Sequence, residues 1–269
     1  MNAATIHARM HGSSYLSLRF DEIRGGKSML DLKGRWVLVT GAGRGIGRLA
    51  ALKLMEYGVN LILVSRDKSH TEDIEKKAIE QGLEAVSFGC DLGIKEEVEG
   101  LITELLKYDI DVVLNNAGIQ VTYRSGVWDT PWEDYELSFR VNTIAPMMIC
   151  YALLPKMKEK GFGRILNTTS GIDRDPFQGP YSASKAALDK VTKDLDVTLN
   201  GEDILLFLTD PGWCRTDLGG PQAPNSPESA VTGCIAGAFA SKGKNGTIIH
   251  AQDYADKTLE EAVSAIENM

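Results

Sequence analysis

A tyrosine and a lysine stand four residues apart in the segment YSASK, residues 181–185. A helical pattern over 182–199 predicts that Tyr181 and Lys185 project from the same helix face, because residues four apart are neighbours there. A free tyrosine loses its proton only near pH 10, and a cation at roughly 5 Å in an effective dielectric of about 20 favours the phenolate by about 3 kcal/mol. The pair is therefore suited to acid/base chemistry near neutral pH.

The segment TGAGRGIG, residues 40–47, places Gly41, Gly45 and Gly47 between a short apolar run and a helical pattern. Glycines let the chain turn sharply, let its backbone approach a pyrophosphate and let the next helix pack closely, while the helix N-terminus supplies N–H donors and a positive dipole. The order strand, loop, helix predicts a dinucleotide-phosphate site. The alternative is a tight strand-to-helix turn without a ligand.

Short apolar runs alternate with longer amphipathic stretches from residue 35 onward. The runs are apolar on both pleat faces, which is typical of parallel strands that helices cover on both sides. Strands are predicted at 36–40, 61–65, 85–88, 112–115, 164–168, 204–209 and 247–250. Helices are predicted at 46–57, 72–81, 96–107, 132–158, 182–199 and 228–241. The expected fold is α/β, one doubly wound seven-stranded parallel sheet with helices on both faces, and its ligands bind at the carboxyl edge of the strands.

The glycine loop and further segments resemble, in the same order, those of the short-chain dehydrogenase/reductase (SDR) family. These segments are Asp91-Leu92 after the third predicted strand, Asn115-Asn116-Ala117-Gly118 after the fourth, the Tyr181 and Lys185 pair after the fifth, and Asp210-Pro211-Gly212-Trp213-Cys214-Arg215-Thr216 after the sixth. The resemblance covers about residues 30–250, and the stretch 211–220 is similar to the carbonyl-reductase-like branch. It implies a single-domain Rossmann fold over residues 29–269.

The resemblance also implies how a nicotinamide cofactor is bound. The Asp91 carboxylate accepts from the adenine amine, the segment 115–118 walls the adenine side, the turn 211–216 holds the nicotinamide carboxamide, and Lys185 holds the ribose hydroxyls. The implied cofactor-binding residues are Gly41, Gly43, Arg44, Gly45, Ile46, Gly47, Ser65, Arg66, Asp91, Leu92, Asn116, Ala117, Gly118, Tyr181, Lys185, Pro211, Gly212, Cys214 and Thr216.

Four catalytic residues follow from the same resemblance: Asn142, Ser170, Tyr181 and Lys185. Tyr181 exchanges the proton at the carbonyl or alcohol oxygen, Ser170 hydrogen-bonds that oxygen, and Asn142 supports a relay water to Lys185. The spacing of 11 from Ser170 to Tyr181 is two residues shorter than usual in the family, so Thr168 is the alternative hydroxyl. We assign Ser170, because the preceding segment Gly163-Arg164-Ile165-Leu166 aligns with the family without a gap and a shortened loop is a smaller change than a shifted strand, whose side chains change face with each residue of shift. For Asn142 the alternative is a solvent-facing helix position.

Charge at the end of the second predicted strand indicates which nicotinamide cofactor is preferred. A carboxylate there suits free ribose hydroxyls, whereas guanidinium groups attract a 2′-phosphate. The position is Ser65, followed by Arg66, and Arg44 lies in the glycine loop. This arrangement predicts NADP(H) rather than NAD(H). The alternative is that Asp67 bonds the ribose and both arginines are surface cations.

Three loops, 119–131, 171–180 and 213–227, are expected to border the substrate. They carry aromatic side chains that suit an apolar pocket, namely Tyr123, Trp128, Phe177 and Trp213. The helices predicted at 132–158 and 182–199 commonly form the subunit interface in the family, so a homodimer or homotetramer is expected.

Composition argues against several other classes of protein. The 269 residues include 29 Lys and Arg against 37 Asp and Glu, a net charge of −8 with a pI near 5.1, so the positive field that binds nucleic acid or anionic lipid is missing. Four scattered cysteines and four histidines without ligand spacing predict neither a disulfide scaffold nor a metal site. No apolar run approaches the roughly 20 residues of a membrane span, and the N-terminus lacks a signal-peptide pattern. A cytoplasmic protein with a flexible, polar extension at residues 1–28 is expected.

The expected function is an NADP(H)-dependent oxidoreductase that transfers hydride between nicotinamide and a small-molecule carbonyl or secondary alcohol, with Tyr181 as the acid/base. An alternative substrate is a 3-oxoacyl thioester on an acyl-carrier protein, although the net charge of −8 offers no basic surface for an acidic carrier. Another alternative is a non-catalytic, nucleotide-sensing protein of the same fold, since fold does not decide function. All four catalytic positions are filled, which favours an enzyme.

Overall fold

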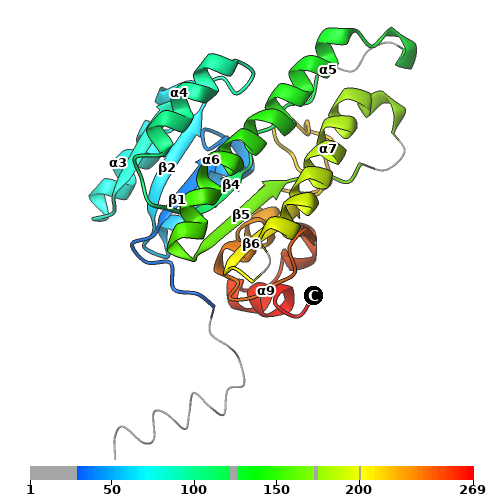
Figure 1. The fold of residues 1–269 in the computed structure, drawn as a ribbon. Coiled ribbons are helices and arrows are strands. Elements are labelled where there is room, and N and C mark those ends of the chain that lie inside the picture. The colour runs from blue at the N-terminus through cyan, green and yellow to red at the C-terminus, as the bar shows by residue number, and fades with distance from the viewer. Residues whose placement is uncertain (1–28, 122–125, 173–174, 200) are drawn as a thin grey trace, which may run out of the picture.

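The computed structural model describes residues 29–121, 126–172, 175–199 and 201–269. Residues 1–28, expected to form a flexible extension, lie outside this description (Figure 1). The assignment of residues 29–269 to a single domain stays a prediction.

Seven parallel strands form one sheet in the order β3-β2-β1-β4-β5-β6-β7 (Figure 1). The strands are β1 (Trp36–Thr40), β2 (Asn60–Ser65), β3 (Ala85–Gly89), β4 (Ile110–Asn115), β5 (Gly163–Thr168), β6 (Ile204–Asp210) and β7 (Thr247–His250). The predicted doubly wound, parallel α/β sheet is confirmed, and each strand lies within two residues of its predicted bounds. The order reverses between β1 and β4, which is where ligands bind in sheets of this kind.

Helices cover both faces of the sheet. They are α2 (Gly45–Met55), α3 (Glu72–Glu80), α4 (Lys95–Leu105), α5 (Trp132–Phe139), α6 (Ala145–Lys160), α7 (Gly179–Leu195), α8 (Val231–Ala236) and α9 (Leu259–Ile266). Alternate residues of β1 show the two layers: Val37 and Val39 pack in the core with α2, α3, α8 and α9, whereas Leu38 packs in the core with α4, α6 and α7. Burial on both sides explains why the strands are apolar on both pleat faces.

The helices differ from expectation in three places. The helix predicted at 132–158 is two helices, α5 and α6. They are joined by one turn of π-helix at Arg140–Ile144, called the π-turn below. The helix predicted at 228–241 is a short α8 flanked by 3₁₀ turns, Glu228–Ala230 and Gly237–Phe239. Helix α9 was not predicted, although its start carries a capping box in which Thr258 and Glu261 bond each other's backbone.

Among the described residues, the helical run Trp132–Lys160 is the one segment that is long and apolar enough to cross a membrane, since an 18-residue window within it has a mean hydropathy of 1.4. However, 61% of that window is buried inside the protein. The same composition is expected of a helix that packs in a core.

Candidate active site

Helix α7 places Tyr181 and Lys185 one turn apart, as the sequence spacing predicts. Both side chains are buried, with Tyr181 7% and Lys185 2% exposed. The Lys185 Nζ lies 6.0 Å from the Tyr181 ring centroid and donates a 2.6 Å hydrogen bond to the carbonyl of Thr168, the last residue of β5. The pair therefore lies at the carboxyl edge of the sheet.

A chain of buried polar side chains fixes α7 against the strands. The Asn115 Nδ2 of β4 donates to the Asn167 Oδ1 of β5 at 2.9 Å, and the Asn167 Nδ2 donates to the Thr192 Oγ1 of α7 at 2.9 Å. Buried polar groups that satisfy one another in this way specify a single arrangement. The position of α7, and with it Tyr181 and Lys185, is thus set relative to β5.

The ionisation of Lys185 is strongly perturbed. Burial lowers its pKa to about 8, while the nearby Asp189 acts in the opposite direction and raises it. Lys185 therefore carries its charge at neutral pH and loses it as the pH rises through about 8. A cation that is present at neutral pH is what a tyrosine acid/base needs beside it.

Asn142 lies inside the π-turn and is fully buried, so the solvent-facing alternative does not hold. Its Oδ1 accepts from the backbone N–H of Ile119 at 2.8 Å, and its Nδ2 donates to the Ile119 carbonyl at 2.9 Å and to the Ser184 Oγ at 3.0 Å. A Cβ on Gly118 would lie 3.3 Å from the Asn142 Oδ1 and 3.4 Å from the Lys185 Nζ. The π-turn, a feature found often at functional sites, thus brings Asn142 to the loop beside Lys185.

Ser170 and the alternative Thr168 have different surroundings. Thr168 belongs to β5, and its hydroxyl faces the Thr209 hydroxyl of β6 at 3.5 Å. Ser170 follows the strand by two residues, and both residues are partly exposed. Exposure therefore does not separate the two hydroxyls, and the role of Ser170 stays a prediction.

The glycine loop packs against segment 115–118 too closely for side chains. Gly41 has a φ of +69°, and a Cβ on it would lie 2.9 Å from the Ala117 Cα. A Cβ on Gly47 would lie 2.3 Å from the Asn116 Nδ2. Thr40 joins the two segments, since its Oγ1 accepts from the Ala117 N–H at 3.1 Å. The glycines therefore let the loop pack directly on segment 115–118 at the N-terminus of α2, and a cradle of backbone N–H groups at such a position suits a pyrophosphate.

The turn after β6 closes the cradle from the other side. A Cβ on Gly45 would lie 3.3 Å from the Thr216 Cγ2. The Pro211 carbonyl accepts from the Gln252 Nε2 at 2.7 Å and from the Cys214 Sγ at 3.3 Å. Ile46, at the start of α2, packs against the small cluster that contains Cys214. The turn predicted to hold the carboxamide therefore lies beside the glycine loop, held by Gln252, which the sequence analysis did not single out.

The residues expected to determine the preference for NADP(H) or NAD(H) lie around the end of β2. Ser65 is 8% exposed, and a Cβ on Gly43 would lie 3.2 Å from its Cβ. Arg66 is exposed with its Nε 3.5 Å from the Asp91 Oδ2, while Arg44 is paired with the exposed Asp217 at 2.7 Å.

The other acids of this edge have partners within their own turns. The Asp67 carboxylate accepts from the backbone N–H and the hydroxyl of Ser69, and these bonds lower its pKa. The Asp91 Oδ1 accepts from the Gly93 N–H at 2.8 Å, and Leu92 packs against the core beneath α4. Both bonds end on the Asp67 Oδ1, so Asp67 caps a turn and the alternative that it holds a ribose stays open.

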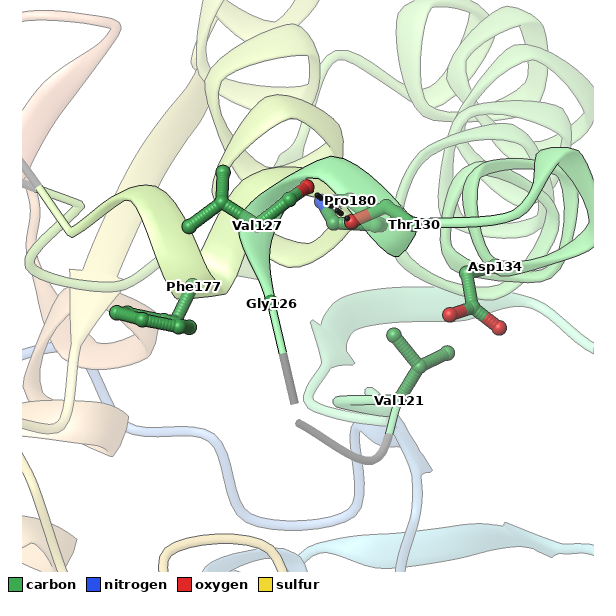
Figure 2. A pocket seen from close by; sticks show the side chains of 7 residues that line it. All are labelled: Val121, Gly126, Val127, Thr130, Asp134, Phe177 and Pro180. Carbon is green, nitrogen blue, oxygen red and sulfur yellow. Dashed lines mark hydrogen bonds between the residues drawn. The ribbon is translucent and has the colours of Figure 1, made fainter. Parts of the chain in front are cut away.

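A small cavity of about 10 Å³, room for about one water molecule, lies at the start of α7 (Figure 2). It is lined by Val121, Gly126, Val127, Thr130, Asp134, Phe177 and Pro180. Of the aromatic residues expected near the substrate, Phe177 lines this cavity, whereas Trp128 is 95% and Trp213 58% exposed and neither lines it. Tyr123 lies outside the described residues. Pro180 directly precedes Tyr181 in α7, but Tyr181 itself is not among the residues that line the cavity.

Comparisons with protein families and with known proteins identify relatives of this chain. Residues 35–226 match the short chain dehydrogenase family. A very-long-chain 3-oxoacyl-CoA reductase from Anas platyrhynchos is 31% identical over 229 residues, 81% of this chain and 73% of that protein. A 5-keto-D-gluconate 5-reductase from Escherichia coli (strain K12) is 29% identical over 195 residues, 71% of this chain and 76% of that protein.

Two solved structures are similar to the fold described above. A short chain dehydrogenase from Shigella flexneri 2a, complexed with NADP, is 26% identical with a TM-score of 0.74, and the match covers 82% of this chain and 99% of that chain. An NAD⁺-bound xylitol dehydrogenase is 31% identical with a TM-score of 0.62, and the match covers 69% of this chain and 72% of that chain.

Proposed function

The chain belongs to the short-chain dehydrogenase family, and we propose that it is an NADP(H)-dependent oxidoreductase acting on a carbonyl or a secondary alcohol. The observation that carries this proposal is the buried pair on α7, with the Lys185 Nζ 6.0 Å from the Tyr181 ring. The pair lies beside a backbone cradle that fits a dinucleotide. An acid/base group next to such a cradle supports redox chemistry at an oxygen-bearing carbon.

The chain's own residues would handle the proton and orient the oxygen. Tyr181 gives its proton to the carbonyl oxygen during reduction and takes it back during oxidation. Lys185, charged below a pKa of about 8, favours the phenolate and makes this exchange possible near neutral pH. Ser170 hydrogen-bonds the same oxygen, and Asn142 holds the loop at Ile119 beside Lys185. The bound nicotinamide would supply or accept the hydride.

Several observations support NADP(H) over NAD(H). Arg66 is exposed at the end of β2, and Arg44 lies in the glycine loop, where guanidinium groups suit a 2′-phosphate. The carboxylate of Asp67 is engaged by Ser69. Relatives of known structure include both an NADP complex and an NAD⁺ complex, so the preference rests on this chain's own charges.

The substrate proposal rests on the family and on the pair on α7, because the cavity at Pro180, at about 10 Å³, has room for about one water molecule. Four of its lining residues, Val121, Val127, Phe177 and Pro180, are apolar, so apolar side chains border the start of α7. A 3-oxoacyl thioester is the second candidate, because the relative from Anas platyrhynchos is named a 3-oxoacyl-CoA reductase.

The test is the oxidation of NADPH and of NADH, followed by absorbance, against aldehydes, ketones, quinones, hydroxysteroid ketones and 3-oxoacyl thioesters. We expect turnover with NADPH and a kcat/KM at least about tenfold lower with NADH, since Arg66 would pair with the 2′-phosphate that NADH lacks. Arg66→Gln should remove most of this difference by weakening NADPH alone. Cofactor binding without turnover of any carbonyl would instead favour the nucleotide-sensing alternative.

We also propose that two or four copies associate through α5 and α6. Large apolar side chains there are exposed, namely Trp132, Tyr135, Ile144, Met148 and Tyr151, and an apolar hollow lies between Trp132, Tyr135 and Phe139. An exposed patch of this kind marks an interface. The cytoplasmic location stays a prediction.

Light scattering should give a mass of about two or four times the 29.3 kDa of one chain. Trp132→Glu should shift the population to the single chain, because a buried unpaired carboxylate is costly at an interface. Trp128→Glu, at a side chain that is 95% exposed and lies outside this patch, is the matched control. A wild-type mass of one chain would contradict the proposal.

A further inference from the structure

Gln252 lies beside the turn after β6 that is predicted to hold the nicotinamide carboxamide. Strands β6 and β7 are parallel neighbours, and Asp210 pairs with His250 at their ends. Two residues beyond this pair, Gln252 lies next to Gly212, because parallel strands leave the sheet in the same direction. A Cβ on Gly212, whose φ is +71°, would lie 2.9 Å from the Gln252 Cγ. The glycine therefore leaves the space that the glutamine side chain fills.

Both ends of the Gln252 amide are used. The Nε2 donates to the Pro211 carbonyl at 2.7 Å and lies 3.6 Å from the Cys214 Sγ. The Oε1 accepts from the Ser229 Oγ at 2.9 Å. A carbonyl can only accept, so the nitrogen has to face Pro211, and the amide has one orientation. The side chain thus joins the turn 211–216 to the 3₁₀ turn that precedes α8.

The other hydrogen bonds of the turn are local. The Gly212 N–H donates to the Asp210 Oδ1 at 2.9 Å, and the Arg215 N–H donates to the Asn225 carbonyl at 2.9 Å. A segment held mainly by local bonds opens at a low cost in free energy. The bond from Gln252 adds an anchor from the end of the neighbouring strand β7.

We propose that Gln252 is a positioning residue for the nicotinamide end of the cofactor: it fixes the turn 211–216 in the orientation that receives the carboxamide. The identity of the ligand rests on the proposed function, whereas the hold of Gln252 on the turn does not. Gln252 contacts neither cofactor nor substrate in this proposal. It acts through the backbone of Pro211 and Gly212.

The order of the strands makes this role separable from cofactor binding in general. The residues predicted to choose between NADP(H) and NAD(H), Ser65 and Arg66, lie around the end of β2. Strands β1, β4 and β5 lie between β2 and β6 in the sheet, and neighbouring strands are about 4.8 Å apart. A change at Gln252 should therefore weaken the hold on the nicotinamide half and leave the adenine half bound as before.

The first test compares, by calorimetry, the binding of NADP⁺ and of 2′-phospho-ADP-ribose, which has the same adenine half and pyrophosphate but no nicotinamide ring. Gln252→Met keeps the length of the side chain and loses both hydrogen bonds. It should weaken NADP⁺ binding about fivefold or more, the usual effect of one lost hydrogen bond, and change 2′-phospho-ADP-ribose binding less than about twofold. Gln252→Glu should weaken NADP⁺ binding at least as much, because an ionised carboxylate cannot donate to the Pro211 carbonyl. Equal losses for both ligands, or no loss for either, would overturn the inference.

A milder variant and a matched control accompany this comparison. The Ser229 hydroxyl shares its one proton between the Gln252 Oε1 and the Ser226 carbonyl, which is 2.7 Å away. Ser229→Ala should therefore give a smaller loss of the same kind, and it repeats the test if Gln252→Met does not fold. Gln81→Met, at an exposed glutamine after α3, should leave the binding of both ligands unchanged.

A second readout needs no cofactor. Hydrogen–deuterium exchange of peptides that cover residues 211–220 should be about tenfold faster in cofactor-free Gln252→Met than in the wild type, with β1 and β5 unchanged. Unchanged exchange over residues 211–220 would contradict the hold of Gln252 on the turn.

The binding and turnover assays together keep the two proposals apart. Selective loss of NADP⁺ affinity in Gln252→Met, in a protein whose wild type turns over no carbonyl, would support the role of Gln252 and count against the proposed function. Turnover by the wild type, with the same affinities for both ligands in Gln252→Met, would overturn the role of Gln252 alone.

Discussion

Tyr181→Phe is expected to lower kcat for carbonyl reduction by about 10²- to 10⁴-fold, the contribution typical of a positioned acid or base. The substitution removes one hydroxyl and keeps the ring, which is buried at the start of α7. The backbone cradle of the glycine loop is unchanged. The affinity for NADPH should therefore stay within about threefold of the wild type, and the loss should fall on kcat.

The measurement pairs NADPH oxidation at saturating substrate with a fluorescence titration of NADPH binding. Tyr108→Phe, in the turn between α4 and β4 and so at the opposite edge of the sheet from Tyr181, is a matched control that should leave both quantities unchanged. If Tyr181→Phe kept more than about a tenth of the wild-type kcat, another group would have to provide the proton. Thr168 and Ser170, the hydroxyls at the end of β5, would then be the next candidates.

The sheet could be predicted closely because each strand is apolar on both faces. Val37, Leu38 and Val39 are all fully buried, and such a run has only one stable place, between two layers of helices. It could then be predicted that the motif residues lie close together, because the carboxyl ends of parallel strands lie at one edge of the sheet. Spacing along α7 was enough to place Lys185 one turn from Tyr181.

Other parts of the site depend on geometry that a sequence pattern does not record. The π-turn around Asn142 has the same apolar pattern as an ordinary helix, so nothing in the spacing separates α5 from α6. The exposure of Trp128 was also not predictable, because an aromatic residue in a loop packs or not according to its distant neighbours. By contrast, α9 could have been found from Thr258 and Glu261, three residues apart.

Gly47→Ala is expected to weaken NADPH binding by at least about tenfold and to lower the free energy of unfolding by about 1–3 kcal/mol, the usual cost of an overpacked site. A Cβ on Gly47 would lie 2.3 Å from the Asn116 Nδ2 and 2.4 Å from the Gly41 carbonyl oxygen. Neither the Asn116 side chain nor the Gly41 backbone can move away easily. Asn116 donates to the Thr40 carbonyl at 3.2 Å, and Gly41 is fixed in a left-handed turn against Ala117.

Gly100→Ala is the matched control for Gly47→Ala, because it is the same substitution in another helix. Gly100 lies in α4, and a Cβ there would meet nothing within 4 Å. Alanine is the better helix former, so Gly100→Ala should raise the free energy of unfolding by about 0.5–1 kcal/mol and leave NADPH binding unchanged. Urea unfolding of the cofactor-free proteins and fluorescence titration with NADPH measure the two effects separately. If Gly47→Ala matched Gly100→Ala in both, the close approach of the glycine loop to Asn116 would not be what shapes the cofactor cradle. If Gly47→Ala lost affinity with little loss of stability, the added methyl group would have displaced the loop while the sheet beneath it stayed intact.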